Sequence, residues 1–244
     1  MNILYVVGSG SKWADNELRY SLRSVEKYGR NVDNIFIVGR KPDFLNEKVI
    51  LLPCDDPYPT KHKNIMYKIR QAIKKLPIGE HFLVSSDDHF YIKETDFDNY
   101  PVYFKNIEIP ACTPAGYNTT DYWRSLAETR QLLLRKGLNI YQTNLHCNTH
   151  IDVTLWRENK ELFREALMLP HGGEINLLMG NLLIAYGVEP VLMDDCKITN
   201  FKDIKQVKDR LAERECFSIS DEAIKCGIVE YLNEKFPDKS KYEK

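Results

Sequence analysis

The sequence predicts an α/β fold built on a mixed, mainly parallel sheet with helices on its faces. Short apolar runs and helical patterns alternate over residues 1–90 in the order β-α-β-β-α-β. The predicted strands carry few polar residues, which is typical of a parallel sheet that helices cover on both faces. These two observations favour a single sheet-centred unit over a helical bundle or an all-β sandwich.

The N-terminal elements each have a local signature. Four apolar, β-rich runs predict the strands at residues 3–7, 34–39, 48–53 and 81–86. Residues 15–29 predict a helix, since Leu18, Leu22 and Val25 fall on one face and Gly29 follows as a stop. Residues 63–76 predict a second helix, with a helical period through Ile65, Ile69, Ala72 and Ile73.

The rest of the chain is less regular. Short strands are expected at residues 90–93 and 101–112, and a last strand within 188–198. Helices are expected at residues 120–137, from about residue 153, at 172–187 and in the tail. There is no internal repeat or low-complexity linker. We therefore expect one domain, with residues 1–200 as its main unit and 201–244 as a helical C-terminal extension.

Composition excludes several classes of protein. An apolar fraction of 43% and a charged fraction of 28% are typical of a globular chain. The formal net charge of −1 gives no global reason to expect nucleic-acid or anionic-membrane binding. No apolar run approaches the roughly 20 residues of a membrane span, and the N-terminus lacks the basic region of a signal peptide. Six scattered cysteines without a C-x-x-C pair predict reduced thiols, and a cytoplasmic protein is expected.

Asp87, Asp88 and His89 follow the fourth predicted strand directly. In open α/β sheets, ligands bind beyond the carboxyl ends of the strands. Carboxylates at that edge suit Mg²⁺ or Mn²⁺, and such an ion can stabilise a leaving diphosphate. The alternative is a pair of aspartates that only caps the end of a strand. For His89, a solvated or a structural histidine is the expectation.

Two more histidines, His146 and His150, lie in the polar stretch "NLHCNTHIDV". The asparagines and threonine around them favour a loop or strand over a helix. A neutral histidine can complete a metal sphere that aspartates begin, or act as an acid or base near neutral pH. A histidine that only forms hydrogen bonds in a turn is the alternative.

Basic side chains lie near the starts of the two predicted helices. Arg19 and Arg23 are one turn apart, and Lys61, Lys63 and Asn64 lie at the second helix N-terminus. Cations there oppose the helix dipole, so their placement suggests a bound anion such as a phosphate. Solvated surface charge is the alternative.

Other polar residues are candidates for contact with substrates. The loop that begins with Gly8 and Ser9 has only a G-x-G element, which is weak by itself, and we expect it to touch a nucleotide base or ribose. Glu174 is interpreted as a general base or as a charge at a helix start. Asp194 and Asp195 form a second acidic pair, for which a turn is favoured over a substrate contact.

Residues 16–46 and 81–92, "NELRYSLRSVEKYGRNVDNIFIVGRKPDFLN" and "HFLVSSDDHFYI", resemble the Stealth family of sugar-phosphate transferases. The resemblance implies a GT-A-like, Rossmann-like core that binds a nucleotide sugar and a divalent metal, Mn²⁺ or Mg²⁺. The family's acidic pair corresponds to Asp87 and Asp88. Its later histidine region is similar to "LHCNTHIDVTLWRENKELF", where His150 is the better match and His146 the second.

The general GT-A plan needs a nucleotide-binding first half, an acidic metal motif after a central strand, and an acceptor-facing second half. We therefore expect a glycosyltransferase that uses a nucleoside-diphosphate sugar, linked to uridine, and an unknown acceptor. Asp87, Asp88 and His150 are expected to hold the metal, with Asp88, His150 and Glu174 as catalytic residues. Tyr117, Asp121, Trp123 and Glu174 are expected to face the acceptor. The alternatives are sugar-1-phosphate transfer onto a polysaccharide and a non-catalytic nucleotide-sugar-binding protein.

Overall fold

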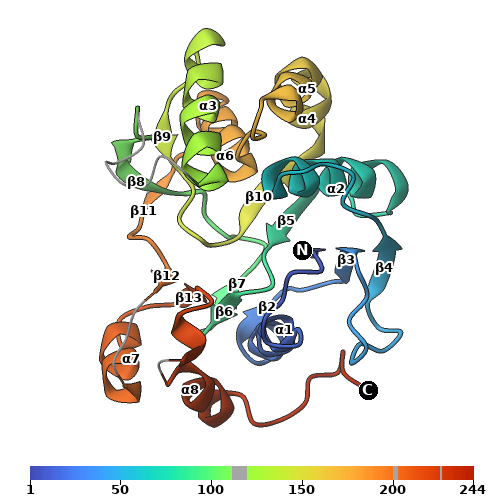
Figure 1. Cartoon of the computed structure of the whole chain (residues 1–244), viewed down its shortest axis with the longest axis vertical. Helices are drawn as coiled ribbons and strands as arrows, with labels where there is room; N and C mark the ends of the chain where they lie inside the picture. The colour runs from blue at the N-terminus through green and yellow to red at the C-terminus, as the bar shows by residue number, and fades with distance from the viewer. Residues whose placement is uncertain (112–119, 200–202, 226) are drawn as a thin grey trace.

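The computed structural model of the chain describes residues 1–111, 120–199, 203–225 and 227–244. A five-stranded sheet lies at its centre, in the order β10-β5-β1-β3-β4 (Figure 1). Four of these strands run parallel, and β10 is antiparallel to β5. They span β1 Asn2–Val7, β3 Ile35–Gly39, β4 Ile50–Pro53, β5 His81–Ser85 and β10 Thr149–Asp152. The prediction of a mixed α/β fold with a mainly parallel sheet is confirmed.

The side chains on the two faces of this sheet belong to two separate apolar clusters. Leu4, Phe36 and Val84 point to one face, while Tyr5 and Leu83 point to the other. All five are buried, as the continuous apolar runs predict for a sheet covered on both sides. The alternation follows directly from the two-residue period of a strand.

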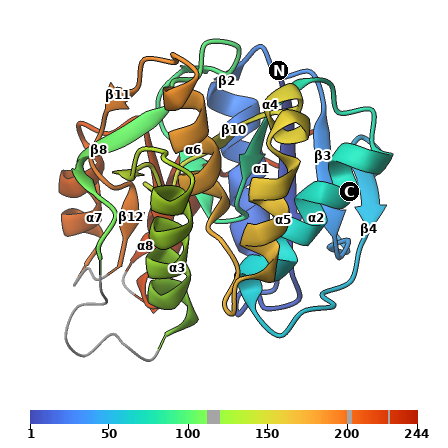
Figure 2. The ribbon, with the colours of Figure 1, turned by 90° about the horizontal axis from the view of Figure 1, so that it is seen from above.

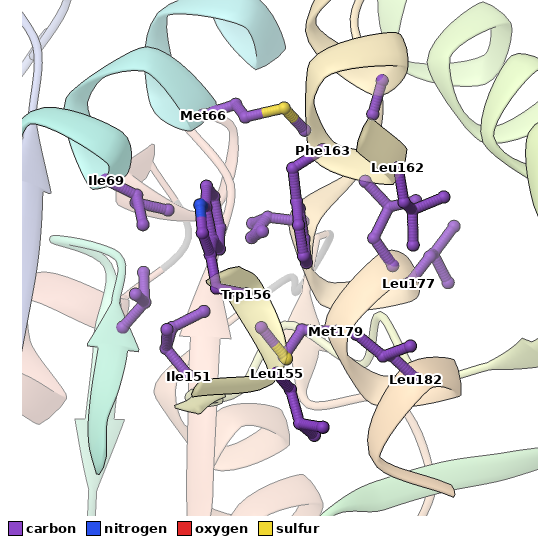
Figure 3. Close-up of a cluster of buried hydrophobic side chains, with 14 of the residues drawn as sticks. Met66, Ile69, Ile151, Leu155, Trp156, Leu162, Phe163, Leu177, Met179 and Leu182 are labelled. Atoms are coloured by element: carbon purple, nitrogen blue, oxygen red, sulfur yellow. The ribbon is translucent and has the colours of Figure 1, made fainter. Parts of the chain in front are cut away.

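Helix α1, Asn16–Tyr28, covers one face of the sheet through Leu18, Leu22 and Val25. The other face is covered by α2 (Lys61–Lys75), α4 (Val153–Glu158), α5 (Lys160–Met168) and α6 (Ile175–Ala185), with α3 (Asp121–Arg135) outside them. Figure 3 shows side chains from α2, α4, α5 and α6 meeting near Ile151 of β10, and the rings of Trp156 and Phe163 stack with centroids 3.9 Å apart. The helical periods correctly predicted α1 and α2, whereas the single helix expected from about residue 153 is divided into α4 and α5.

Strands β8 (Tyr103–Glu108), β9 (Tyr141–Gln142) and β11 (Val191–Leu192) form a small sheet beside α3 and α6. Helix α6 can approach this region closely because it has no side chain at Gly180, where a Cβ atom would lie 2.5 Å from Oγ1 of Thr143. The neighbouring Asn181 is buried and bonds both the N–H and the carbonyl of Tyr141. Gly180 and Asn181, inside an otherwise apolar helix, thus allow α6 to pack closely against the segment that contains Tyr141 and Thr143.

The C-terminal part joins the main sheet through β6, His89–Tyr91, which directly follows the acidic pair. Strand β13 (Cys216–Ile219) pairs antiparallel with β6, and β12 (Lys197–Ile198) pairs parallel with β13. Helices α7 (Ile204–Leu211) and α8 (Ile228–Lys235), with the short 3-10 turn Ala223–Lys225, pack on this second small sheet. Figure 2 shows this part on the flank opposite β3 and β4.

The structure corrects two expectations for this region. The predicted last strand is split into β11 and β12, since residues 193–196 bend between two different sheets. The expected helical extension 201–244 also contains a strand, β13, because Cys216, Phe217 and Ile219 are buried against β6. A two-residue ladder, β2 Gly29–Arg30 with β7 Thr95–Asp96, completes the strand pairing.

Within the described residues, no helix is both long and apolar enough to cross a membrane. Four cysteines in the same part of the chain are free thiols, and Cys147, Cys196 and Cys216 are buried. The other two, Cys112 and Cys226, lie outside the described residues.

Candidate functional site

The acidic pair lies at the carboxyl end of β5, in the turn that leads to β6. Strand β1 is parallel to β5, so the loop that begins with Gly8 and Ser9 leaves the same edge of the sheet. Ser11 in this loop donates to Glu17 at the start of α1, with the oxygens 2.8 Å apart. The charge of Glu17 in turn raises the pKa of Asp87, so the first turn of α1 is close to the pair. The sequence therefore placed Asp87 and Asp88 at the edge where ligands bind in such sheets.

Asp88 has a cationic partner that sequence reasoning missed. Its Oδ2 atom lies 2.8 Å from Nζ of Lys197 and accepts a hydrogen bond from Oγ of Ser218 at 3.0 Å. Burial alone would raise the pKa of Asp88, but the charges of Lys197 and His89 hold it well below its usual range. Asp88 is therefore ionised at neutral pH.

The neighbouring Asp87 has the opposite character. No side-chain hydrogen bond or ion pair to its carboxylate is present among the described residues. Burial and the charge of Asp88 raise the pKa of Asp87 to about 7, although Lys61 acts in the other direction. Asp87 is thus poised near neutral pH to hold either a proton or a cation.

His89 is buried on β6, as a structural histidine would be. Its Nδ1 atom lies 3.2 Å from Oδ1 of Asn148, and its Nε2 atom lies 4.0 Å from Oδ1 of Asp88. Burial lowers the pKa of His89 to about 4, although Asp88 favours the charged form. The imidazole ring is therefore neutral at neutral pH, and it packs in the interior beside the carboxylate of Asp88.

His146 forms a dyad with Asp195, for which the sequence had favoured a simple turn. The Nδ1 atom of His146 lies 2.9 Å from Oδ1 of Asp195. Burial would raise the pKa of Asp195, but the hydrogen bond and charge of His146 lower it. The same carboxylate oxygen accepts the backbone N–H of Lys197 at 2.8 Å. The segment that carries Lys197 to Asp88 therefore also carries Asp195 to His146.

Glu174 is buried just before α6, at the edge of the same region. Its Oε2 atom accepts from the side chain of Asn144 at 3.1 Å, and its Oε1 atom lies 4.0 Å from Nε2 of His62. The ring of Tyr122 lies between, with its centroid 6.1 Å from that of His62 and 6.3 Å from that of His146. Tyr122 thus connects the Glu174 group to the His146–Asp195 dyad.

His150 is not brought to the acidic pair, contrary to the expected metal grouping. Strand β10 places it opposite Leu83, in the middle of β5 and well before the turn that carries Asp87. Its Nε2 atom is hydrogen-bonded to the carbonyl of Tyr100, and burial lowers the pKa of His150. Across residues 1–111, 120–199, 203–225 and 227–244, no group of three or more His, Cys, Asp or Glu side chains is arranged to hold a metal.

A small cavity of about 20 Å³ lies beside His150 and includes Asn148 in its wall. The Nδ2 atom of Asn148 is buried and has no hydrogen-bond partner. A cavity of that size holds about one water molecule. A water at this position would satisfy the asparagine, so the cavity is best explained as part of the protein's interior.

Arg19 and Arg23 do not point to a free anion site. Nη1 of Arg19 and Nε of Arg23 each lie 2.7 Å from a carboxylate oxygen of Glu243, whose side chain is fully buried. Arg23 also donates to the carbonyl of Phe236. Both guanidinium groups are thus engaged in fixing the C-terminal segment on α1, which sequence periodicity could not reveal.

The three residues expected at the start of α2 have different surroundings. Lys61 is exposed, and its charge lowers the pKa of both Asp87 and Asp88. Lys63 packs against Gly172, where a Cβ atom would lie 2.8 Å from its Cγ. The side chain of Asn64 bonds the N–H and the carbonyl of Tyr58, both at 2.8 Å. Lys61 is therefore the member of this group that faces the acidic pair.

The expected acceptor-facing residues are spread out. Asp121 is exposed at the start of α3, while Trp123 packs partly buried against the apolar cluster under that helix. Tyr117 lies outside the described residues.

Comparison with protein-family models gives no match, and no curated protein matches the chain either.

Proposed function

We propose that this chain is a metal-dependent glycosyltransferase of the GT-A type, which moves a sugar from a nucleoside-diphosphate sugar, linked to uridine, to an acceptor hydroxyl. The observation that carries the proposal is the half-buried pair Asp87–Asp88 at the carboxyl edge of a parallel sheet, next to the loop after β1. That edge is where such sheets bind nucleotides. The resemblance of residues 16–46 and 81–92 to sugar-phosphate transferases supports the same class of donor.

The residues present fit a divalent cation. Of these two half-buried carboxylates, only that of Asp88 is in direct contact with an ammonium group among the described residues, so the carboxylate of Asp87 has no close cationic partner. Hard cations such as Mn²⁺ and Mg²⁺ prefer carboxylate oxygens and bind phosphates at the same time. Asp87 and Asp88 would hold the ion, which when bound supplies positive charge to the leaving diphosphate.

Lys61 supports the donor's phosphates in this proposal. It begins α2, whose first turn contains no acidic residue, so the helix N-terminus and the ammonium both favour an anion. Ser9 is exposed in the loop after β1, where a ribose or base can lie against the backbone of Gly8. The donor thus lies across the carboxyl ends of β1 and β5.

The His146–Asp195 dyad gives the reaction a base. Asp195 fixes Nδ1 of His146, which leaves Nε2 to accept the proton of the acceptor hydroxyl. The acceptor oxygen forms a bond to the anomeric carbon, and the bond from that carbon to the phosphate oxygen breaks. The electron pair leaves with the nucleoside diphosphate. Glu174 and Tyr122 then lie on the acceptor side.

Calorimetric titration with UDP, with and without Mn²⁺, tests the proposal. Wild type should bind UDP at least about tenfold more tightly with Mn²⁺, and Asp87→Asn should abolish that gain. Asp43→Asn, at an exposed aspartate, is the matched control. If neither UDP nor another nucleoside diphosphate binds wild type with metal present, the proposal fails.

Product analysis then separates the remaining possibilities. Glycosyl transfer releases the nucleoside diphosphate, whereas sugar-1-phosphate transfer releases the nucleoside monophosphate. Binding without turnover of any donor would identify a nucleotide-sugar-binding protein.

A further inference from the structure

Lys197, Ser218 and His89 occupy one line across three neighbouring strands. Lys197 on β12 is paired with Ser218 on β13, and Ser218 is paired with His89 on β6. This register directs the lysine toward Asp88, which immediately precedes β6. The ammonium is therefore placed at the acidic pair by the strand pairing of the C-terminal part, across 109 positions of sequence.

Among the described residues, the ammonium of Lys197 has two close partners, which leaves one of its donors without a partner there. It contacts Oδ2 of Asp88 at 2.8 Å and Oγ of Ser218 at 3.2 Å. A lysine ammonium carries three N–H donors, so one donor is left over. The side chain keeps 23% of its surface exposed, and its ammonium lies beside Asp88 at the carboxyl edge of the sheet, where the proposed ligand binds.

The same contacts place the ammonium where a metal ion would compete with it. Asp88 gives its Oδ2 atom to both Lys197 and Ser218, so a divalent ion must displace one of these donors to use that oxygen. Metal and lysine are both cations and repel each other at this distance. An anionic diphosphate relieves the conflict because it offers the ammonium a new partner. Lysine can make that exchange with its flexible stem, without movement of the backbone.

We propose that Lys197 is the resident counter-ion of the acidic pair and a phosphate-binding residue of the donor site, which exchanges Asp88 for a phosphate oxygen when metal and diphosphate bind together. This inference rests on the proposed donor site. It adds that the free metal binds poorly and that metal and diphosphate bind cooperatively. Lys61, whose charge also acts on both aspartates, then serves as the second phosphate-binding lysine.

The test measures Mn²⁺ alone and Mg²⁺ with pyrophosphate, by calorimetry and by the electron paramagnetic resonance of free Mn²⁺. In Lys197→Met, Mn²⁺ alone should bind about tenfold more tightly than in wild type, because Asp88 loses its competitor. Pyrophosphate with Mg²⁺ should bind about tenfold more weakly, because a phosphate donor is lost. Lys205→Met, at an exposed lysine of α7, is the control and should change neither value.

Ser218→Ala provides a second variant that keeps both charges, in case Lys197→Met folds poorly. It removes one hydrogen bond that Asp88 accepts and one that Lys197 donates, so it should tighten the binding of Mn²⁺ alone by about two- to threefold. It should not weaken the binding of pyrophosphate with Mg²⁺, because the lysine donor is still present. Unchanged or weaker Mn²⁺ binding in both variants, or undiminished pyrophosphate binding in Lys197→Met, overturns the inference.

These outcomes are separate from the failure of the proposed function. Both probes lack a nucleoside and a sugar. A protein that shows the two expected shifts but binds no nucleoside diphosphate would keep the counter-ion role of Lys197 and lose the transferase. A protein that binds UDP with Mn²⁺ but shows neither shift would keep the transferase and lose this inference.

Discussion

Asp87 and Asp88 are adjacent in the chain, but their carboxyl groups have opposite pKa shifts. Burial and the neighbouring charge raise the pKa of Asp87 to about 7, whereas Lys197 and His89 keep that of Asp88 well below its usual range. The difference arises because the only close ammonium of the pair within the described residues contacts Asp88. The carboxylate of Asp88 is thus held by hydrogen bonds and an ion pair, whereas that of Asp87 is available to a ligand.

We expect Asp87→Asn to stabilise the protein at pH 8. Because the folded-state pKa of Asp87 is raised, ionisation of this group costs free energy as pH rises from about 4 to about 7. The substitution should raise the free energy of unfolding at pH 8 by at least about 1 kcal/mol and have little effect at pH 4. Urea unfolding at the two pH values measures this. A destabilisation at pH 8 would contradict the pKa assignment.

Asp88→Asn should have the opposite effect. Its pKa is lowered in the folded state, so the ionised group contributes stability above about pH 4 that is lost as pH falls further. The asparagine leaves Lys197 without its carboxylate, which should cost about 2 kcal/mol at pH 8. The same urea experiment measures it, and equal effects of the two asparagine variants would show that Lys197 does not distinguish the aspartates.

Glu243→Gln should destabilise the fold by about 3 kcal/mol, because two arginines on α1 would lose a buried carboxylate. Burial would raise the pKa of Glu243, but Arg23, the Ser240 backbone and Arg19 lower it to about 2, so its contribution is lost below about pH 4. Glu234→Gln is the control, since Glu234 pairs with Lys208 at the surface with 52% of its side chain exposed. That change should stay within about 0.5 kcal/mol, and equal losses in the two variants would contradict a buried anchor.

Lys61→Met should weaken nucleotide binding by about tenfold, whereas Lys63→Met should change it by less than about twofold. The two lysines are separated by one residue on α2. The charge of Lys61 lowers the pKa of both aspartates, whereas Lys63 packs on Gly172. Calorimetric titration of UDP with Mn²⁺ compares them. A reversed order would mean that the phosphates lie on the Gly172 side of the helix.

His146→Gln should lower the catalytic rate constant by about 10²- to 10⁴-fold with little change in UDP affinity, as expected for loss of a general base. Asp195→Asn should also reduce the rate constant, because it removes the carboxylate that orients His146. Asp194→Asn is the control, since Asp194 is adjacent and exposed. Equal rates for the Asp194 and Asp195 variants would exclude the dyad from the reaction.

The sequence by itself determined the framework on which the acidic pair is displayed. The apolar runs at residues 3–7 and 81–86 and the helical period through Leu18, Leu22 and Val25 are local patterns, set by which side chains repeat every two or every three to four residues. They correctly predicted a mainly parallel sheet with Asp87 and Asp88 at its carboxyl edge. No distant residue is needed for that inference.

Only the tertiary structure decided what meets those aspartates. Lys197 and Ser218 reach Asp88 from 109 and 130 positions away, and Glu243 reaches Arg19 across 224. His150, which the family resemblance favoured, is instead fixed opposite Leu83 by the register of β10. Such contacts depend on how separate elements pair and pack, and a local period carries no information about register between strands far apart in the chain. Tertiary packing therefore determines which charged side chains contact the acidic pair, and the sequence pattern alone does not.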